Sequence, residues 1–152
     1  MAGRPFVVDF STPPQWLYDT PDRVAYPDDP QGETWSYEQG TVLRDPTCGA
    51  IAEYYGRLLA WYTDGGFTDE YGANHTSGHA YNFSVWEYLN EMEHGLSPAD
   101  YTRQYDAVVL AQRRIAPVGS AALQYMGLAL EQNNDVGAYF SYVRRRRRGL
   151  VH

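Results

Sequence analysis

Hydrophobic residues follow two alternating patterns along this chain, short continuous runs and longer stripes with the period of a helix. The runs cover residues 6–10, 83–91 and 123–130. Bulky apolar residues at successive positions, as in the second run, are typical of a strand buried on both faces in a parallel sheet. Between the runs, apolar residues recur every three to four positions, which predicts amphipathic helices.

Local start and stop signals place these helices. The first is expected to begin at residues 45–46, with Asp as N-cap and Pro at the first helical position, and to end at the glycines 65–66. The second is expected to begin at Ser97 and Pro98 and to stop before Pro117. The resulting order, strand, helix, strand, helix, strand, predicts βαβ units with parallel strands and right-handed crossovers.

Composition and charge narrow the class of protein. The apolar fraction of 43% and the aromatic fraction of 15% indicate a packed globular chain. Net charge is −7 with no lysine, and five of the twelve arginines lie at 144–148, so residues 1–143 carry seven arginines against nineteen acids. This acidic balance does not suit a nucleic-acid binder, which needs a basic surface, so no nucleic-acid partner is expected. We expect no export signal and no membrane span, and the compartment stays open.

Glu91 is the polar residue whose position is most informative. It ends the run 83–91, and ligands in parallel α/β folds bind beyond the carboxyl ends of the strands. Strict alternation would place Glu87 on the face of Glu91 and Asn90 on the opposite face. Glu87 is interpreted as a buried structural carboxylate. Asp9, inside the first run, either bonds to nearby groups or serves as a sugar contact or a partner for Glu91.

Residues 86–91, Trp-Glu-Tyr-Leu-Asn-Glu, resemble the fourth strand of retaining glycoside hydrolases with a (β/α)8 barrel, most closely family 39, the xylosidase and iduronidase type. Residues 10–16 resemble the third-strand exit of that family, and residues 93–98 and 101–106 resemble its fourth loop and helix. A full barrel needs roughly 250 residues, and this chain has 152. The resemblance therefore implies an α/β fold, a partial TIM barrel with strands three to five in residues 1–138, followed by a divergent Arg-rich tail at 139–152.

The resemblance also implies the roles of individual residues. Glu91 would be the general acid/base, and Asn90 would bind a sugar hydroxyl, which requires a twist or bulge at the strand end. Trp16 would stack on the sugar, and Glu93 and His94 would line the rim of the site. No metal and no cofactor are expected, and the histidines 75 and 79 fall in a helix-to-strand connection, away from the chemistry.

The expected function is hydrolysis of O-glycosidic bonds by a retaining mechanism with a carbohydrate substrate. The nucleophile of the family belongs to the seventh strand, which this chain lacks, and neither Glu131 nor Asp9 matches a nucleophile motif. Two alternatives stay open: a non-catalytic carbohydrate-binding remnant that uses Trp16 and the aromatic residues of the loop 12–45, or an inactive truncated product. Open strand edges would favour self-association.

Overall fold

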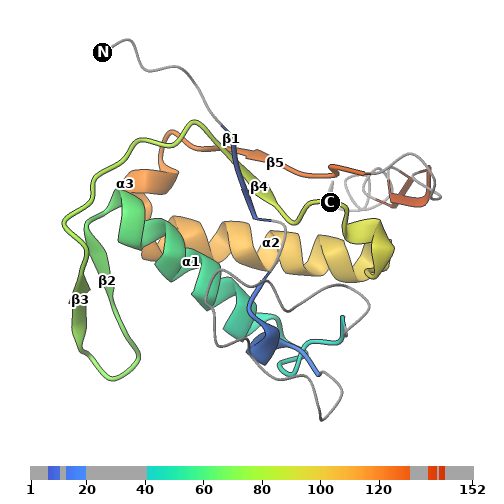
Figure 1. The fold of residues 1–152 in the computed structure, drawn as a ribbon, viewed down its shortest axis with the longest axis horizontal. Coiled ribbons are helices and arrows are strands. Elements are labelled where there is room, and N and C mark those ends of the chain that lie inside the picture. Colours follow the sequence, from blue (N-terminus) through green and yellow to red (C-terminus); the bar gives the residue numbers. More distant parts are fainter. Residues whose placement is uncertain (1–6, 11–12, 20–40, 131–136, 140, 143–152) are drawn as a thin grey trace, which may run out of the picture.

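The centre of the molecule is a three-stranded parallel sheet in the order β1-β4-β5 (Figure 1). This computed structural model describes residues 7–10, 13–19, 41–130, 137–139 and 141–142. The strands are β1 (Val7–Phe10), β4 (Val85–Tyr88) and β5 (Gln124–Met126). In the register of β1 and β4, Asp9 lies opposite Glu87.

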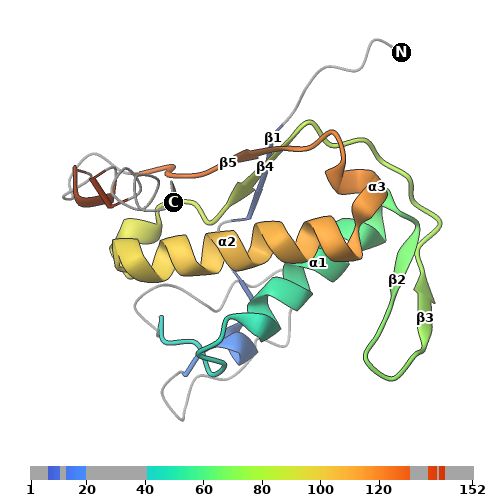
Figure 2. The same cartoon turned by 180° about the vertical axis from the view of Figure 1, so that it is seen from behind.

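The helices α1 (Gly49–Thr63) and α2 (Pro98–Ile115) pack on the same face of this sheet (Figures 1 and 2). The rings of Phe10 and Trp86 lie 4.5 Å apart on that face, and Tyr55 of α1 meets Tyr88 edge-on at 5.2 Å. These contacts bury large aromatic surfaces, which is the main favourable contribution to folding. Strand alternation turns Asp9 and Glu87 to the opposite face.

The predicted order of elements and the parallel pairing are confirmed, and the fold is mixed α/β. Among the described residues the sheet stays open and no closed barrel forms. Trp86, Glu87 and Tyr88 are all buried, so β4 is covered on both faces as expected. The strands are shorter than the apolar runs, since β4 ends at Tyr88, three residues before the carboxylate of Glu91.

The start of α1 was predicted wrongly, and the start of α2 correctly. α1 begins at Gly49, because Asp45 holds the first turn from a distance: its carboxylate accepts the N–H groups of Thr47 at 2.9 Å and Ala50 at 2.8 Å. The hydrogen bond from the Thr47 hydroxyl, followed by those from the backbone N–H groups of Ala50 and Thr47, lowers the pKa of Asp45 to about 2. In α2, Ser97 Oγ accepts the N–H of Asp100 at 3.1 Å, as an N-cap should.

Several short elements were not predicted. The connection between α1 and β4 contains an antiparallel hairpin of β2 (Gly66–Thr68) and β3 (Asn74–Thr76). Helix α3 (Pro117–Ser120) follows α2, and two 3-10 helices, η1 (Gln15–Leu17) and η3 (Met92–His94), follow β1 and β4. None of the helices in the described part of the chain is both long and apolar enough to cross a bilayer.

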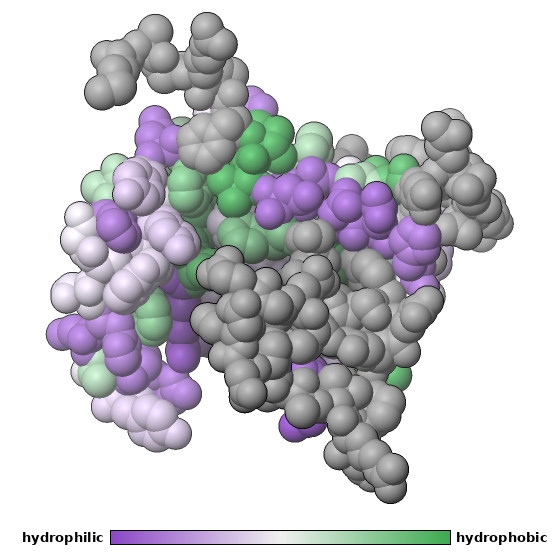
Figure 3. All heavy atoms as spheres, viewed as in Figure 1, coloured by the Kyte–Doolittle hydropathy of each residue, from purple (hydrophilic) through white to green (hydrophobic). Residues whose placement is uncertain are grey.

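The two edge strands expose apolar side chains. Val7 of β1 is 47% exposed and Met126 of β5 is 40% exposed, and Figure 3 shows apolar surface gathered where β1 lies in Figure 1. Unpaired edges with apolar side chains favour pairing with another chain. Self-association through these edges therefore stays a prediction. The boundary of an Arg-rich tail also stays a prediction, because residues 143–152 lie outside the described part.

Candidate functional site at the carboxyl end of the sheet

The backbone twists sharply where β4 ends. Leu89 has φ 57° and Glu91 has φ 51°, the left-handed region that residues other than glycine rarely adopt. The Glu91 N–H donates to the carbonyl oxygen of Ala129 at 2.8 Å, and Asn90 forms a parallel bridge with the same residue. The twisted segment therefore remains attached to the chain that follows β5. In a regular strand the side chains of Asn90 and Glu91 would point to opposite faces, so both can contact one ligand only if the backbone twists between them. Strained backbone is also enriched at functional sites.

The side chain of Glu91 stands partly in solvent, 49% exposed, beyond the carboxyl end of the central strand. His94, at the end of η3, brings its Nε2 to 3.9 Å from Oε2 of Glu91. The short helix η3 thus turns two of the predicted site residues toward each other. Glu91 is accessible to a ligand and has a polar neighbour on one side.

Asp9 and Glu87 add two further carboxyl groups to this end of the sheet. They lie opposite each other on β1 and β4, on the face away from α1 and α2. Burial, and then the charge of Glu91, raises the pKa of Asp9. Burial, and then the charge of Asp9, raises the pKa of Glu87. Asp9 therefore interacts electrostatically with both Glu91 and Glu87 near the strand ends.

Glu87 is the buried member of this group. It is 6% exposed, and its Oε1 atom has no hydrogen-bond partner in the part of the chain that the structure describes. Among the described residues no arginine forms an ion pair with it. A buried carboxylate oxygen without a hydrogen-bond partner is costly, so the protonated form is favoured there. The structural interpretation of Glu87 agrees with its burial.

Tyr101 of α2 ties the ends of β4 and β5 together, a role that the apolar pattern did not reveal. Its hydroxyl donates to the carbonyl of Tyr88 at 3.2 Å and accepts the N–H of Leu128 at 3.3 Å. Burial raises the pKa of Tyr101, so this hydroxyl keeps its proton. Tyr101 thus holds the backbone next to the candidate site.

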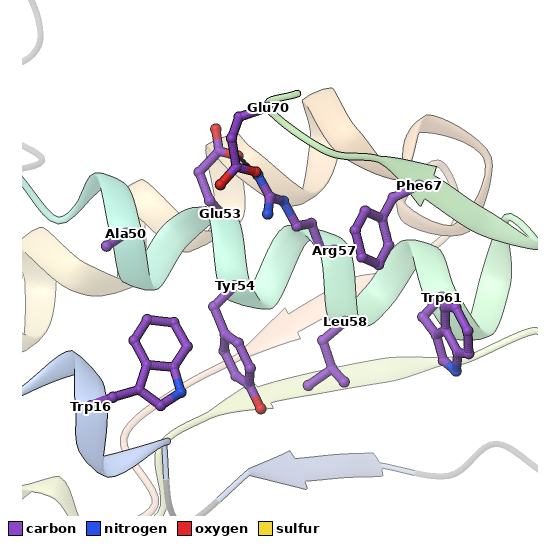
Figure 4. A pocket seen from close by; sticks show the side chains of 9 residues that line it. All are labelled: Trp16, Ala50, Glu53, Tyr54, Arg57, Leu58, Trp61, Phe67 and Glu70. Atoms are coloured by element: carbon purple, nitrogen blue, oxygen red, sulfur yellow. Dashed lines mark hydrogen bonds and ion pairs between the residues drawn. The ribbon is translucent and has the colours of Figure 1, made fainter. Parts of the chain in front are cut away.

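The remaining predicted residues lie elsewhere or outside the described part. Trp16 belongs to η1 and meets Tyr54 of α1 edge-on at 6.0 Å, where it lines a groove on α1 (Figure 4). The ring contact of Trp16 is with Tyr54, whereas the described neighbour of Glu91 is His94, so the structure does not bring Trp16 and Glu91 together. The side chain of Glu93 lies outside the described set, as do Glu131 and the loop aromatics Tyr26, Trp35 and Tyr37.

Metal-ligating side chains do not converge here. Within the described ranges, no group of three or more His, Cys, Asp and Glu residues has the geometry to hold a metal ion. His75 Nε2 lies 2.8 Å from Asp69 Oδ2 on the hairpin, and the ring of His79 stacks on that of Tyr81. These two histidines therefore have local partners away from the strand ends.

Comparison with known proteins does not assign a family to the chain. No protein-family model, no curated protein and no solved structure matches it. A functional proposal must therefore come from the side chains and their surroundings.

Proposed function

We propose that the chain carries the acid/base half of a retaining glycosidase site, built on a partial (β/α)8 barrel that supplies strands three to five. The observation that supports this most directly is the placement of Asn90 and Glu91 beyond the carboxyl end of the central parallel strand. Asp9 of the neighbouring strand interacts there with the charge of Glu91. Active sites of such barrels occupy this end of the strands.

Each residue has a defined part in this chemistry. Glu91 protonates the glycosidic oxygen as the bond to the anomeric carbon breaks, and later removes a proton from the attacking water. Asp9 and Glu87, whose pKa values are raised, take up a proton more readily than free carboxyl groups. This limits the negative charge that gathers beside Glu91. Asn90 and His94 border the same strand end and bind sugar hydroxyls.

The catalytic nucleophile of a retaining enzyme has no counterpart assigned in this chain, so the test supplies one. Azide attacks the anomeric carbon of an aryl xyloside, the bond from that carbon to the aryl oxygen breaks, and Glu91 transfers a proton to the departing oxygen. The products are a phenol and a glycosyl azide of inverted configuration. We expect azide-dependent release of phenol from phenyl xyloside by the intact chain.

Leaving groups of different acidity isolate the role of Glu91. Loss of a general acid lowers the rate about 10²- to 10⁴-fold, so Glu91→Gln should abolish turnover of the phenyl glycoside. The same variant should turn over a dinitrophenyl glycoside almost normally, since that leaving group departs without a proton. Asp19→Asn, which removes an exposed carboxylate elsewhere, is the matched control. Turnover of the phenyl glycoside that survives in Glu91→Gln, or no turnover of any aryl glycoside by the wild type, would refute the proposal.

A further inference from the structure

A groove with a volume of ≈ 650 Å³ runs along α1, between η1 and the hairpin β2–β3 (Figure 4). We call it the α1 groove. It shares no residue with the strand-end acids Asp9, Glu87 and Glu91. Its lining residues are Trp16, Ala50, Glu53, Tyr54, Arg57, Leu58, Trp61, Phe67 and Glu70.

Aromatic rings stand in pairs at the two ends of the α1 groove. Trp16 and Tyr54 meet edge-on at 6.0 Å at one end, and Trp61 and Phe67 lie 6.4 Å apart at the other. Leu58 lies between the pairs (Figure 4). Tyr54 and Trp61 are seven positions apart in the sequence, which corresponds to about 10 Å along a helix. The groove therefore offers two pairs of aromatic side chains, and their spacing suits a ligand made of several linked rings better than a single small molecule.

Charged side chains form one flank of the groove. Arg57 Nη2 lies 2.6 Å from Glu70 Oε2 and 3.2 Å from Glu53 Oε2, and its guanidinium group sits 5.6 Å from the centre of the Phe67 ring. Arg114 of α2 makes a second ion pair with Glu53. The side chains of Glu53 and Glu70 are 40% and 56% exposed, so their oxygens can still accept hydrogen bonds from a ligand.

We propose that the α1 groove binds a neutral oligosaccharide. The apolar face of a pyranose stacks on aromatic rings, and its hydroxyl groups donate to carboxylates, so this flank and these aromatic pairs match the two sides of a sugar. Glu53 and Glu70 already form ion pairs with arginines, so this flank does not favour a charged ligand over a neutral one. An apolar helix bound in the groove would displace water from these ion pairs, and it could not replace the hydrogen bonds that the water makes. Binding here does not depend on catalysis at Glu91.

Titration of the intact chain with xylotetraose, cellotetraose and mannotetraose tests this proposal. Trp86 is buried, while Trp16 is 50% exposed, so a sugar in the groove should change the tryptophan fluorescence. Calorimetry then compares variants whose fold is checked by circular dichroism. We expect Trp16→Ala and Trp61→Ala each to weaken binding of the best ligand by about tenfold.

Two further variants keep the test independent of the tryptophans. Glu70→Gln replaces one carboxylate oxygen at an exposed site with an amide NH2 group and removes the charge, so it should weaken binding severalfold. Tyr71→Ala truncates a ring that is 88% exposed outside the groove, and should leave the affinity unchanged. Three results would overturn the proposal: no tetrasaccharide binds, binding survives unchanged in Trp16→Ala, Trp61→Ala and Glu70→Gln, or sedimentation shows that these substitutions shift a monomer–dimer equilibrium. None of these results bears on the azide-dependent activity, which tests Glu91 separately.

Discussion

The buried carboxyl group of Glu87 should make the protein less stable at neutral pH than it would be with a neutral side chain. Glu87→Gln keeps the shape of the side chain and removes its charge. A buried polar group without a partner costs about 1–3 kcal/mol, and more when it is charged. The glutamine amide retains part of this cost, so we expect the substitution to raise the free energy of unfolding by about 1 kcal/mol at pH 7.

The pH dependence has a definite sign. The folded-state pKa of Glu87 lies above the ordinary value of 4.5, so the folded protein binds this proton more tightly than the unfolded chain does. The contribution of Glu87 to stability therefore falls as pH rises from 4.5 through the raised pKa. The advantage of Glu87→Gln should be absent below pH 4.5 and complete above the raised pKa. The substitution also removes the repulsion between Glu87 and the charge of Asp9, which adds to the gain.

Urea unfolding followed by tryptophan fluorescence, from about pH 3 to pH 8, measures this difference between variant and wild type. Glu70→Gln is a matched control of opposite sign, because hydrogen bonds to its own backbone N–H and to Arg57 lower the pKa of Glu70. Its carboxylate contributes stability above the ordinary pKa and loses it as pH falls. A Glu87→Gln variant that is less stable than wild type at pH 7, or whose difference from wild type does not change with pH, would refute the reasoning.

Two further substitutions probe the packing that supports the candidate site. Tyr88→Phe removes the hydroxyl that donates to Oε1 of buried Gln104 at 3.0 Å, so the free energy of unfolding should fall by about 1–3 kcal/mol in urea titrations. An unchanged midpoint would show that this oxygen finds another donor. Gly119→Ala would place a methyl group against the side chain of Thr63 and 2.8 Å from Oδ1 of Asp64. It should cost about 1–3 kcal/mol, seen as a lower Tm, and a Tm equal to that of wild type would mean that the end of α1 shifts freely.

Local patterns in the sequence determined the kinds of element and their order. The alternation of strand runs and helix stripes predicted the five main elements, because each depends on residues a few positions apart. The start of α2 was predicted correctly for the same reason: Ser97 and Asp100 form their hydrogen bond within one turn. The start of α1 was missed because Asp45 reaches Ala50 across an extra turn, which a simple N-cap pattern does not describe.

Contacts between distant segments decided the rest. Whether Asp9 faces Glu87 depends on the register of two strands that lie far apart in the sequence. Trp16 follows β1 closely in the chain, yet packing against Tyr54 places it on α1 rather than beside Glu91. The carboxylate of Glu91 follows the central strand as its position in the sequence indicates, whereas the left-handed twist that directs it is held by a hydrogen bond to Ala129. Side-chain identity and short spacings can be seen in a linear sequence, but register and burial arise only when separate segments pack together.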